Sequence, residues 1–220
     1  MATHLVVVTS HGTLAGERNG TYAPELTHAI HEFTKAGDTF DIASPKGGAA
    51  PLYGEDIEDG INREILAMDL VESSLRSTKR LADIDPSGYE SVFYPGGYGL
   101  LFDLAEDEIS ASIASHVFES GGVIGSVCHG PVGLLPVRLS DGSSLLESRE
   151  VTGFTREEEI DYGTIDKIPY LLEERLTRAA RQYSKVAPWR EFVVTDQRVI
   201  SGQNPQSAGL VARSMIKQMA

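Results

Sequence analysis

The chain has 220 residues, of which 41% are hydrophobic, so it can bury one sizeable core, and we expect one domain over residues 1–220. Its 19 basic and 32 acidic residues give a formal net charge of −13 without a basic block, which argues against a nucleic-acid partner. The single cysteine excludes an internal disulfide and a cysteine-based zinc site. We expect a cytoplasmic protein with no signal peptide and no membrane span, because residues 5–8 are too short an apolar run.

The first half of the chain alternates between predicted strands and helices. Short β-branched runs that end in turn residues predict strands over residues 5–8, 39–43, 91–94 and 123–127. Apolar residues at helical spacing predict helices over residues 24–35 and 106–119. Residues 49–90 are polar and are interpreted as a long excursion, with helical fragments over 61–71 and 74–84.

The second half continues with a predicted strand over residues 150–154, an acidic cluster, and a helix over 169–182. An antiparallel pair is predicted over residues 191–195 and 198–201, joined at Asp196-Gln197, before a closing helix over 205–219. The alternation of strands and helices predicts an α/β fold with a doubly wound, mostly parallel sheet.

The cysteine lies where a catalytic turn is expected. Cys128 follows the strand over residues 123–127, and Gly130-Pro131 is predicted to begin a helix. Ser126 and Gly130 are small, as a nucleophile elbow requires where strand and helix backbones pass close together. A buried cysteine that only fills space is the alternative for a lone Cys in an apolar stretch.

Three of the predicted turns meet at the carboxyl edge of such a sheet, where active sites of open α/β folds lie. They carry Glu25, the Gly96-Gly97 pair, and Cys128 with His129. A helix N-terminus, an imidazole and a carboxyl partner are expected to lower the pKa of the thiol. Backbone N–H groups of the Gly96-Gly97 loop and of His129 are predicted to form an oxyanion hole.

Nine segments, in this order, resemble the ThiJ/PfpI superfamily and specifically its heat-shock-chaperone-like branch, which includes glutathione-independent glyoxalases. These segments are Thr9-Ser10, residues 22–26, 43–48, 95–99, 101–103, 127–131, 151–155, 187–189 and 202–205. The resemblance implies a flavodoxin-like sandwich, similar to class I glutamine amidotransferases, that assembles as a homodimer. It also implies conversion of methylglyoxal, a 2-oxoaldehyde, and water to D-lactate without a cofactor or a metal.

The resemblance assigns candidate roles residue by residue. Cys128 stands at the nucleophile of the family, His129 at the histidine that follows it, and Glu25 at the buried glutamate near the thiol. Glu25 would otherwise be interpreted as a surface residue in the first turn of a helix. The third acid of the triad is assigned to Glu159, with Glu158 as the alternative, although successive glutamates also occur on solvated faces.

The loop at residues 97–99 departs from the family pattern, because Tyr98 replaces the usual histidine beside the expected oxyanion and substrate site at Gly97. A phenol donates one hydrogen bond but is a poor proton shuttle, since its pKa is about 10. The change leaves the choice of substrate open.

The predicted mechanism adds the Cys128 thiolate to the aldehyde carbon, moves a proton through Glu25, and hydrolyses a thioester with help from His129 and Glu159. Two alternatives are another cysteine-dependent enzyme of the superfamily (amidase, peptidase, isonitrile hydratase or deglycase) and a holdase chaperone or oxidant sensor that performs no catalysis. His28 and His31 have a spacing that can hold a metal, but no complete zinc motif surrounds them, and we expect no metal site.

Overall fold

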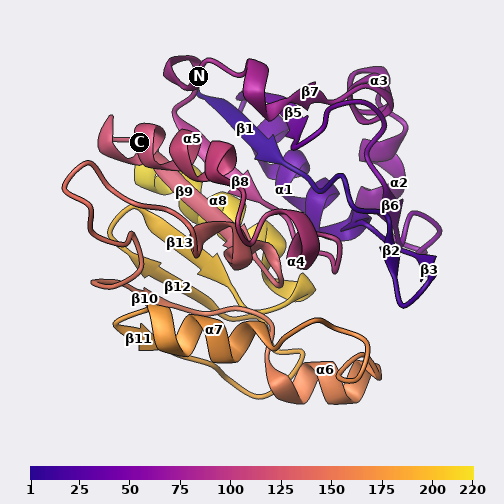
Figure 1. Cartoon of the computed structure of the whole chain (residues 1–220). Coiled ribbons are helices and arrows are strands. Elements are labelled where there is room, and N and C mark those ends of the chain that lie inside the picture. Colours follow the sequence, from indigo (N-terminus) through magenta and orange to yellow (C-terminus); the bar gives the residue numbers. More distant parts are fainter.

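The structure, a computed structural model, describes all 220 residues. Its core is a seven-stranded sheet in the order β12-β13-β9-β8-β1-β5-β7 (Figure 1). The strands are β1 (Thr3–Val7), β5 (Thr39–Ser44), β7 (Lys79–Arg80), β8 (Ser91–Tyr94), β9 (Val123–Val127), β12 (Val193–Asp196) and β13 (Val199–Gly202). Only the β12-β13 pair is antiparallel. The predicted α/β fold with a mostly parallel, flavodoxin-like sheet is confirmed, because the order β5-β1-β8-β9-β13 is that of a flavodoxin-like fold.

Helices cover both faces of the sheet. One face packs against α1 (Ala23–Lys35), α2 (Gly60–Leu66), α3 (Asp69–Arg76) and α8 (Ala208–Met219). The other packs against α4 (Leu100–Asp103), α5 (Glu108–Glu119), α7 (Leu172–Ala179) and the 3₁₀ helix η3 (Gly130–Leu134). The remaining helices are α6 (Arg156–Tyr162), η1 (Leu81–Asp83), η2 (Pro86–Gly88) and η4 (Pro205–Ser207).

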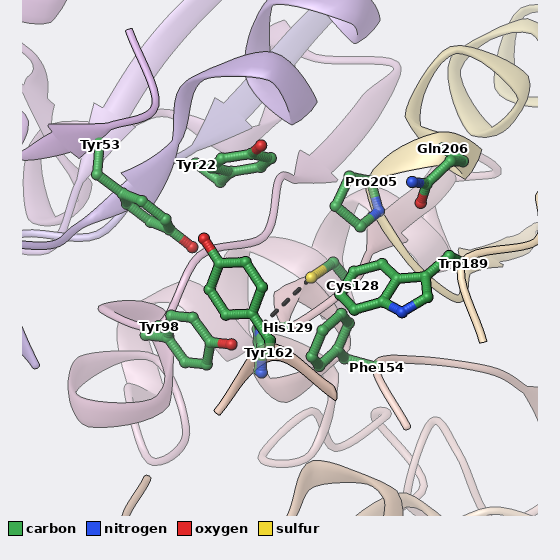
Figure 2. Close-up of a pocket in the computed structure, with 10 residues that line it drawn as sticks. All are labelled: Tyr22, Tyr53, Tyr98, Cys128, His129, Phe154, Tyr162, Trp189, Pro205 and Gln206. Carbon is green, nitrogen blue, oxygen red and sulfur yellow. Dashed lines mark hydrogen bonds between the residues drawn. The ribbon is translucent and has the colours of Figure 1, made fainter. Parts of the chain in front are cut away.

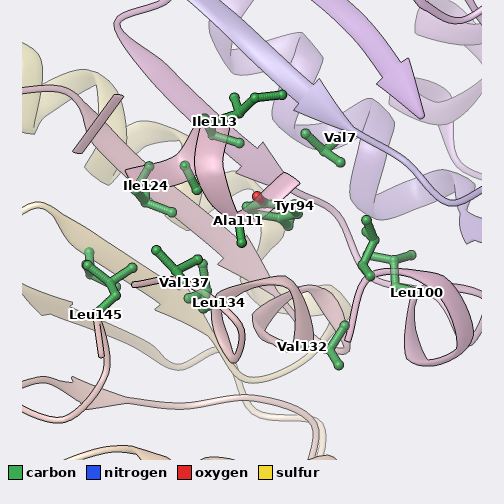
Figure 3. Close-up of a cluster of buried hydrophobic side chains, with 14 of the residues drawn as sticks. Val7, Tyr94, Leu100, Ala111, Ile113, Ile124, Val132, Leu134, Val137 and Leu145 are labelled. Atoms are coloured by element: carbon green, nitrogen blue, oxygen red, sulfur yellow. The ribbon is translucent and has the colours of Figure 1, made fainter. Parts of the chain in front are cut away.

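Alternation along β1 explains how one strand serves both layers. Leu5 and Val7 point into the cluster under α5, whereas Val6 and Val8 point into the cluster under α1 and α8. All four side chains are fully buried, which stabilises the fold by about 1.5–3 kcal/mol for each. Figure 3 shows the cluster on the α5 side, where Val7 and Tyr94 of the sheet lie among residues of α4, α5 and η3.

Three two-stranded sheets lie outside the main sheet. The hairpin of β2 (Thr13–Leu14) and β3 (Glu17–Arg18) is antiparallel, while β4 (Thr21–Tyr22) with β6 (Leu52–Tyr53) and β10 (Glu150–Val151) with β11 (Gln182–Tyr183) are parallel. The β4-β6 pair matters for the site because it joins the loop after β1 to the long excursion and ends both of its strands on a tyrosine.

Several element predictions were wrong in extent. The fragment predicted as a helix over 74–84 contains the end of α3, then β7 and η1, because Thr78 and Lys79 pair with the chain at Gly48 and β5. The predicted strand over 150–154 is only β10, and the helix predicted over 169–182 is the shorter α7, since residues 182–183 pair with β10. The segment after Cys128 forms the 3₁₀ helix η3 instead of a longer helix.

Candidate active site

Cys128 occupies a strained turn directly after β9. Its φ of 59° lies in the left-handed region, which is uncommon for residues other than glycine and often marks a functional position. The backbone of Cys128 is fixed on both sides, because its N–H donates to Gly202 and its carbonyl accepts from Phe154, both at 2.9 Å. Gly130 must be glycine, since a Cβ there would lie 2.2 Å from the carbonyl oxygen of Tyr94.

A hydrogen-bonded chain runs from the thiol into the protein. The Sγ of Cys128 lies 3.3 Å from Nδ1 of His129, and Nε2 of His129 lies 2.8 Å from Oε1 of Glu159. His129 and Glu159 are both almost completely buried. Cys128, His129 and Glu159 therefore provide the nucleophile, base and orienting acid that nucleophilic catalysis requires.

The second oxygen of Glu159 is held by two hydroxyl groups. Thr164 donates to Oε2, and the Tyr98 hydroxyl lies 3.3 Å from the same atom. Burial disfavours the charged form of this carboxyl, but His129 and the hydrogen bond from Thr164 outweigh that cost and lower its pKa. Glu159 is therefore held as a carboxylate with one oxygen facing the imidazole.

Glu158 has a different environment, although it was the alternative third acid. Its side chain forms a capping box with Thr155 at the start of α6. The Oε1 atom also accepts hydrogen bonds from the backbone of Trp189 and from the side chains of Gln203 and Asn204. The contacts of Oε1 join α6 to Trp189 and to the loop after β13, and no contact of Glu158 involves His129.

Glu25 lies under the nucleophile and not on the surface. It is the third residue of α1 and is fully buried, and neither carboxyl oxygen has a hydrogen-bond partner of good geometry. A Cβ placed on Gly96 would lie 2.2 Å from Oε2 of Glu25 and 2.7 Å from Cβ of Cys128, so these two atoms are less than about 5 Å apart. Only glycine at position 96 lets the carboxyl group approach the thiol.

The electrostatics of this pair differ from the prediction. Burial raises the pKa of Glu25 to about 8, although the nearby Cys128 thiol and the Gly96 N–H lower it. Burial and the negative charge of Glu25 also raise the pKa of Cys128, so the expectation of a lowered thiol pKa was wrong. The physical reason is that burial and three nearby glutamates outweigh the short η3, whose five residues provide little helix dipole.

The loop after β8 supplies backbone donors. Gly97 has a φ of 118°, and neither its N–H nor that of His129 donates to another backbone group. Both N–H groups are therefore free to donate to a ligand, and the oxyanion hole stays a prediction for them. The Tyr98 side chain packs against the His129 ring, with centroids 4.5 Å apart, and its hydroxyl lies 2.9 Å from the Thr164 hydroxyl.

The thiol lies at the bottom of a small cavity of about 110 Å³ (Figure 2). The residues that line it are Tyr22, Tyr53, Tyr98, Cys128, His129, Phe154, Tyr162, Trp189, Pro205 and Gln206. Seven of these ten side chains are hydrophobic or aromatic. Since one water needs about 10–15 Å³ of such space, the cavity has room for a small molecule beside the thiol.

Sequence reasoning missed much of this lining. Tyr53 lies in the polar excursion that gave no clear pattern, and Tyr162 ends a helix that was interpreted only as an acidic cluster. Trp189 lies in the family-like segment 187–189 but was given no role of its own; its indole lines the cavity and its backbone N–H donates to Glu158. Thr164 had no signal in the sequence beyond its position five residues after Glu159.

His28 and His31 do not form part of a metal cluster. His28 is 2.8 Å from Asp59, which also caps α2, so the pair joins α1 to α2. No group of three or more His, Cys, Asp or Glu side chains is placed to hold a metal ion. None of the helices has both the length and the apolar character that crossing a membrane requires.

Comparisons with known proteins agree with the resemblance in the sequence. The profile of the DJ-1/PfpI family matches residues 18–218. Glyoxalase 3 of Candida albicans is 31% identical over 220 residues, which cover 91% of this chain and 90% of the relative. The structure of the 24 kDa rapid encystment protein of Francisella tularensis covers all of both chains with a TM-score of 0.95 and 31% identity. The crystal structure of glyoxalase III from Candida albicans has a TM-score of 0.89 and 28% identity, covering 99% of this chain and 97% of the other.

Proposed function

The chain belongs to the DJ-1/PfpI family, and from this premise we propose that it is a glutathione-independent glyoxalase that converts methylglyoxal and water to D-lactate. The observation that carries the proposal is the pairing of a nucleophilic chain, Cys128-His129-Glu159, with the buried Glu25 carboxyl beside the thiol. The cavity adds support, because its small, mostly hydrophobic lining around the thiol suits a three-carbon 2-oxoaldehyde.

The first step is addition of the thiolate to the aldehyde carbon. In the proposed reaction, the Cys128 proton passes to His129 or to ionised Glu25, and the sulfur forms a bond to C1 of methylglyoxal. The electron pair of the C1 carbonyl moves to its oxygen, O1, which is stabilised by the N–H groups of Gly97 and His129. Protonation of O1 gives a hemithioacetal.

The second step moves a proton from C1 to C2. A carboxylate at Glu25 takes the proton from C1, and the electron pair forms an enediolate whose charge lies on the second oxygen, O2. The carboxyl group then returns the proton to C2 while the proton on O1 passes to O2, which leaves a thioester of D-lactate. A pKa of about 8 suits this role, because the group can exist in both protonation states near neutral pH. The redox change is internal to the substrate, so the reaction needs no external oxidant or reductant.

The last step is hydrolysis of the thioester. His129 takes a proton from the attacking water, and Glu159 stabilises the positive imidazole from the opposite nitrogen. The thioester carbonyl has the same two backbone donors as O1. The bond between sulfur and carbon then breaks, which releases D-lactate and restores the thiol.

We also propose that residues 1–220 act as one domain in a cytoplasmic homodimer. The lone cysteine suits a reducing compartment such as the cytoplasm. The family resemblance supports the homodimer. Light scattering of the purified protein measures the assembly, and a mass of one chain would contradict it.

The proposal is tested by D-lactate formation from methylglyoxal without glutathione. We expect turnover by the wild type and none by Cys128→Ser, because the serine hydroxyl is a much weaker nucleophile at neutral pH. If neither protein forms D-lactate but Cys128 of the wild type reacts readily with an alkylating reagent, the chain is instead another cysteine-dependent enzyme of the family, with a different substrate.

A further inference from the structure

Three tyrosine hydroxyls in the cavity have no partner in the protein. Tyr98 is engaged with Glu159 and Thr164, but the hydroxyls of Tyr22, Tyr53 and Tyr162 make no hydrogen bond. Hydroxyl groups at a substrate cavity that lack protein partners are available to a ligand.

Regular secondary-structure elements fix the positions of these three tyrosine rings. Tyr22 and Tyr53 are paired residues of β4 and β6, with ring centroids 5.0 Å apart. Tyr162 is the last residue of α6, the helix that carries Glu159. In Figure 2 the hydroxyls of Tyr53 and Tyr162 lie on one side of the Cys128 sulfur, and the rings of Phe154 and Trp189 lie on the other. The cavity therefore has a phenolic side and an apolar side.

Of the three phenols, Tyr53 is the best placed to meet a substrate bound to the thiol. It is partly buried, whereas Tyr162 is 56% exposed at the mouth. Burial raises the pKa of Tyr53, and the nearby Cys128 raises it further, so the hydroxyl stays protonated and can donate. Its ring lies next to that of Tyr98, with centroids 6.3 Å apart.

The chemistry of a 2-oxoaldehyde needs a second donor. In the proposed mechanism the N–H groups of Gly97 and His129 serve the oxygen of the carbon that sulfur attacks. The enediolate places its charge on the neighbouring oxygen, O2, and a donor preorganised at that position lowers the barrier. The methyl group at the other end of methylglyoxal is apolar and suits the side formed by Phe154 and Trp189.

We propose that the Tyr53 hydroxyl donates a hydrogen bond to O2 of the bound 2-oxoaldehyde and so makes the site selective for vicinal dicarbonyls. This inference rests on the proposed function and names a specificity residue for it. Tyr162 closes the same side of the cavity. A site built to hydrogen-bond a substrate oxygen strongly disfavours an analogue that lacks it.

The test compares Tyr53→Phe with the wild type in two assays. In the first, kcat/KM for D-lactate formation from methylglyoxal falls about 10- to 100-fold, as expected for loss of one donor to a developing charge. In the second, methylglyoxal or propanal protects Cys128 from alkylation by iodoacetamide, measured at early times. Propanal has the same carbon chain but no second carbonyl. We expect Tyr53→Phe to weaken protection by methylglyoxal and to leave protection by propanal unchanged.

Tyr89→Phe is the matched control. Tyr89 precedes β8, at the end of that strand opposite the site, and its hydroxyl donates to Asp41. The Tyr53 proposal is overturned if kcat/KM stays within about twofold of the wild type or if protection by both aldehydes weakens equally. If the wild type forms no D-lactate, the proposed function fails, and the protection assay still decides the role of Tyr53.

Discussion

Replacement of Glu25 by glutamine is expected to make Cys128 more reactive at high pH while it abolishes turnover. The pKa of Glu25 is about 8, so the carboxyl is mainly neutral at pH 6 and glutamine resembles it there. At pH 9 the wild-type carboxyl is ionised, and its charge raises the pKa of the neighbouring thiol. Glutamine removes that charge, so the variant contains more thiolate at pH 9.

The magnitude follows from the distance between the two groups. Oε2 of Glu25 and Cβ of Cys128 are less than about 5 Å apart. Two unit charges at that distance interact by about 3 kcal/mol at an effective dielectric constant of about 20, which corresponds to roughly a hundredfold in an equilibrium constant. Water in the cavity reduces this effect, so we expect alkylation at pH 9 to be at least about tenfold faster in the variant.

The assay is the rate of Cys128 alkylation by iodoacetamide between pH 6 and pH 9.5. Glu157→Gln is the control, because Glu157 belongs to the same acidic run but is exposed and bonded to Lys185. Its alkylation profile should match the wild type. Equal or slower alkylation of Glu25→Gln at pH 9 would refute the proposed coupling between carboxyl and thiol.

Three further substitutions probe the surroundings of the thiol. Glu159→Gln removes the charge that supports His129, and kcat for D-lactate should fall roughly a hundredfold while Cys128 still forms its adduct; an unchanged kcat would exclude this role. Gly96→Ala inserts a methyl group against Glu25 and the nucleophile, so turnover should be lost and stability reduced by about 1–3 kcal/mol in urea unfolding. Glu158→Gln keeps one acceptor oxygen for two sets of donors, so either the loop donors at Oε1 or the Thr155 donors at Oε2 would face an NH2 group; this should cost about 2–3 kcal/mol and lower Tm by roughly 5–10 °C, and a Tm within about 1 °C of the wild type would contradict it.

The sheet was predictable because its strands are buried on both faces. Residues 5–8 are a continuous apolar run and residues 123–127 are apolar apart from Ser126; their shortness, β-branched content and bounding turn residues favour strands over helices. The prediction failed where pairing is decided by distant segments. Residues 79–80 and 182–183 are polar, and they form strands only because β5 and β10 lie beside them.

The residues of the site could be predicted from the sequence, but their contacts and electrostatic surroundings could not. The family resemblance assigned Glu25 near the thiol and left Glu158 and Glu159 open, since adjacent glutamates differ only in which side of α6 they occupy. The structure directs Glu159 to His129 and Glu158 to the loops around β13. The raised pKa of Cys128 was not predictable, because it depends on burial and on charges that converge from separate segments.

The most direct test of the mechanism is the mass of Glu25→Gln under non-denaturing conditions in the presence of methylglyoxal, measured together with D-lactate. The account assigns addition to Cys128 and proton transfer to Glu25. It therefore predicts that the variant gains the mass of one methylglyoxal, bound at Cys128, and forms no D-lactate. D-lactate formation at the wild-type rate, or an equal mass gain by Cys128→Ser, would contradict it.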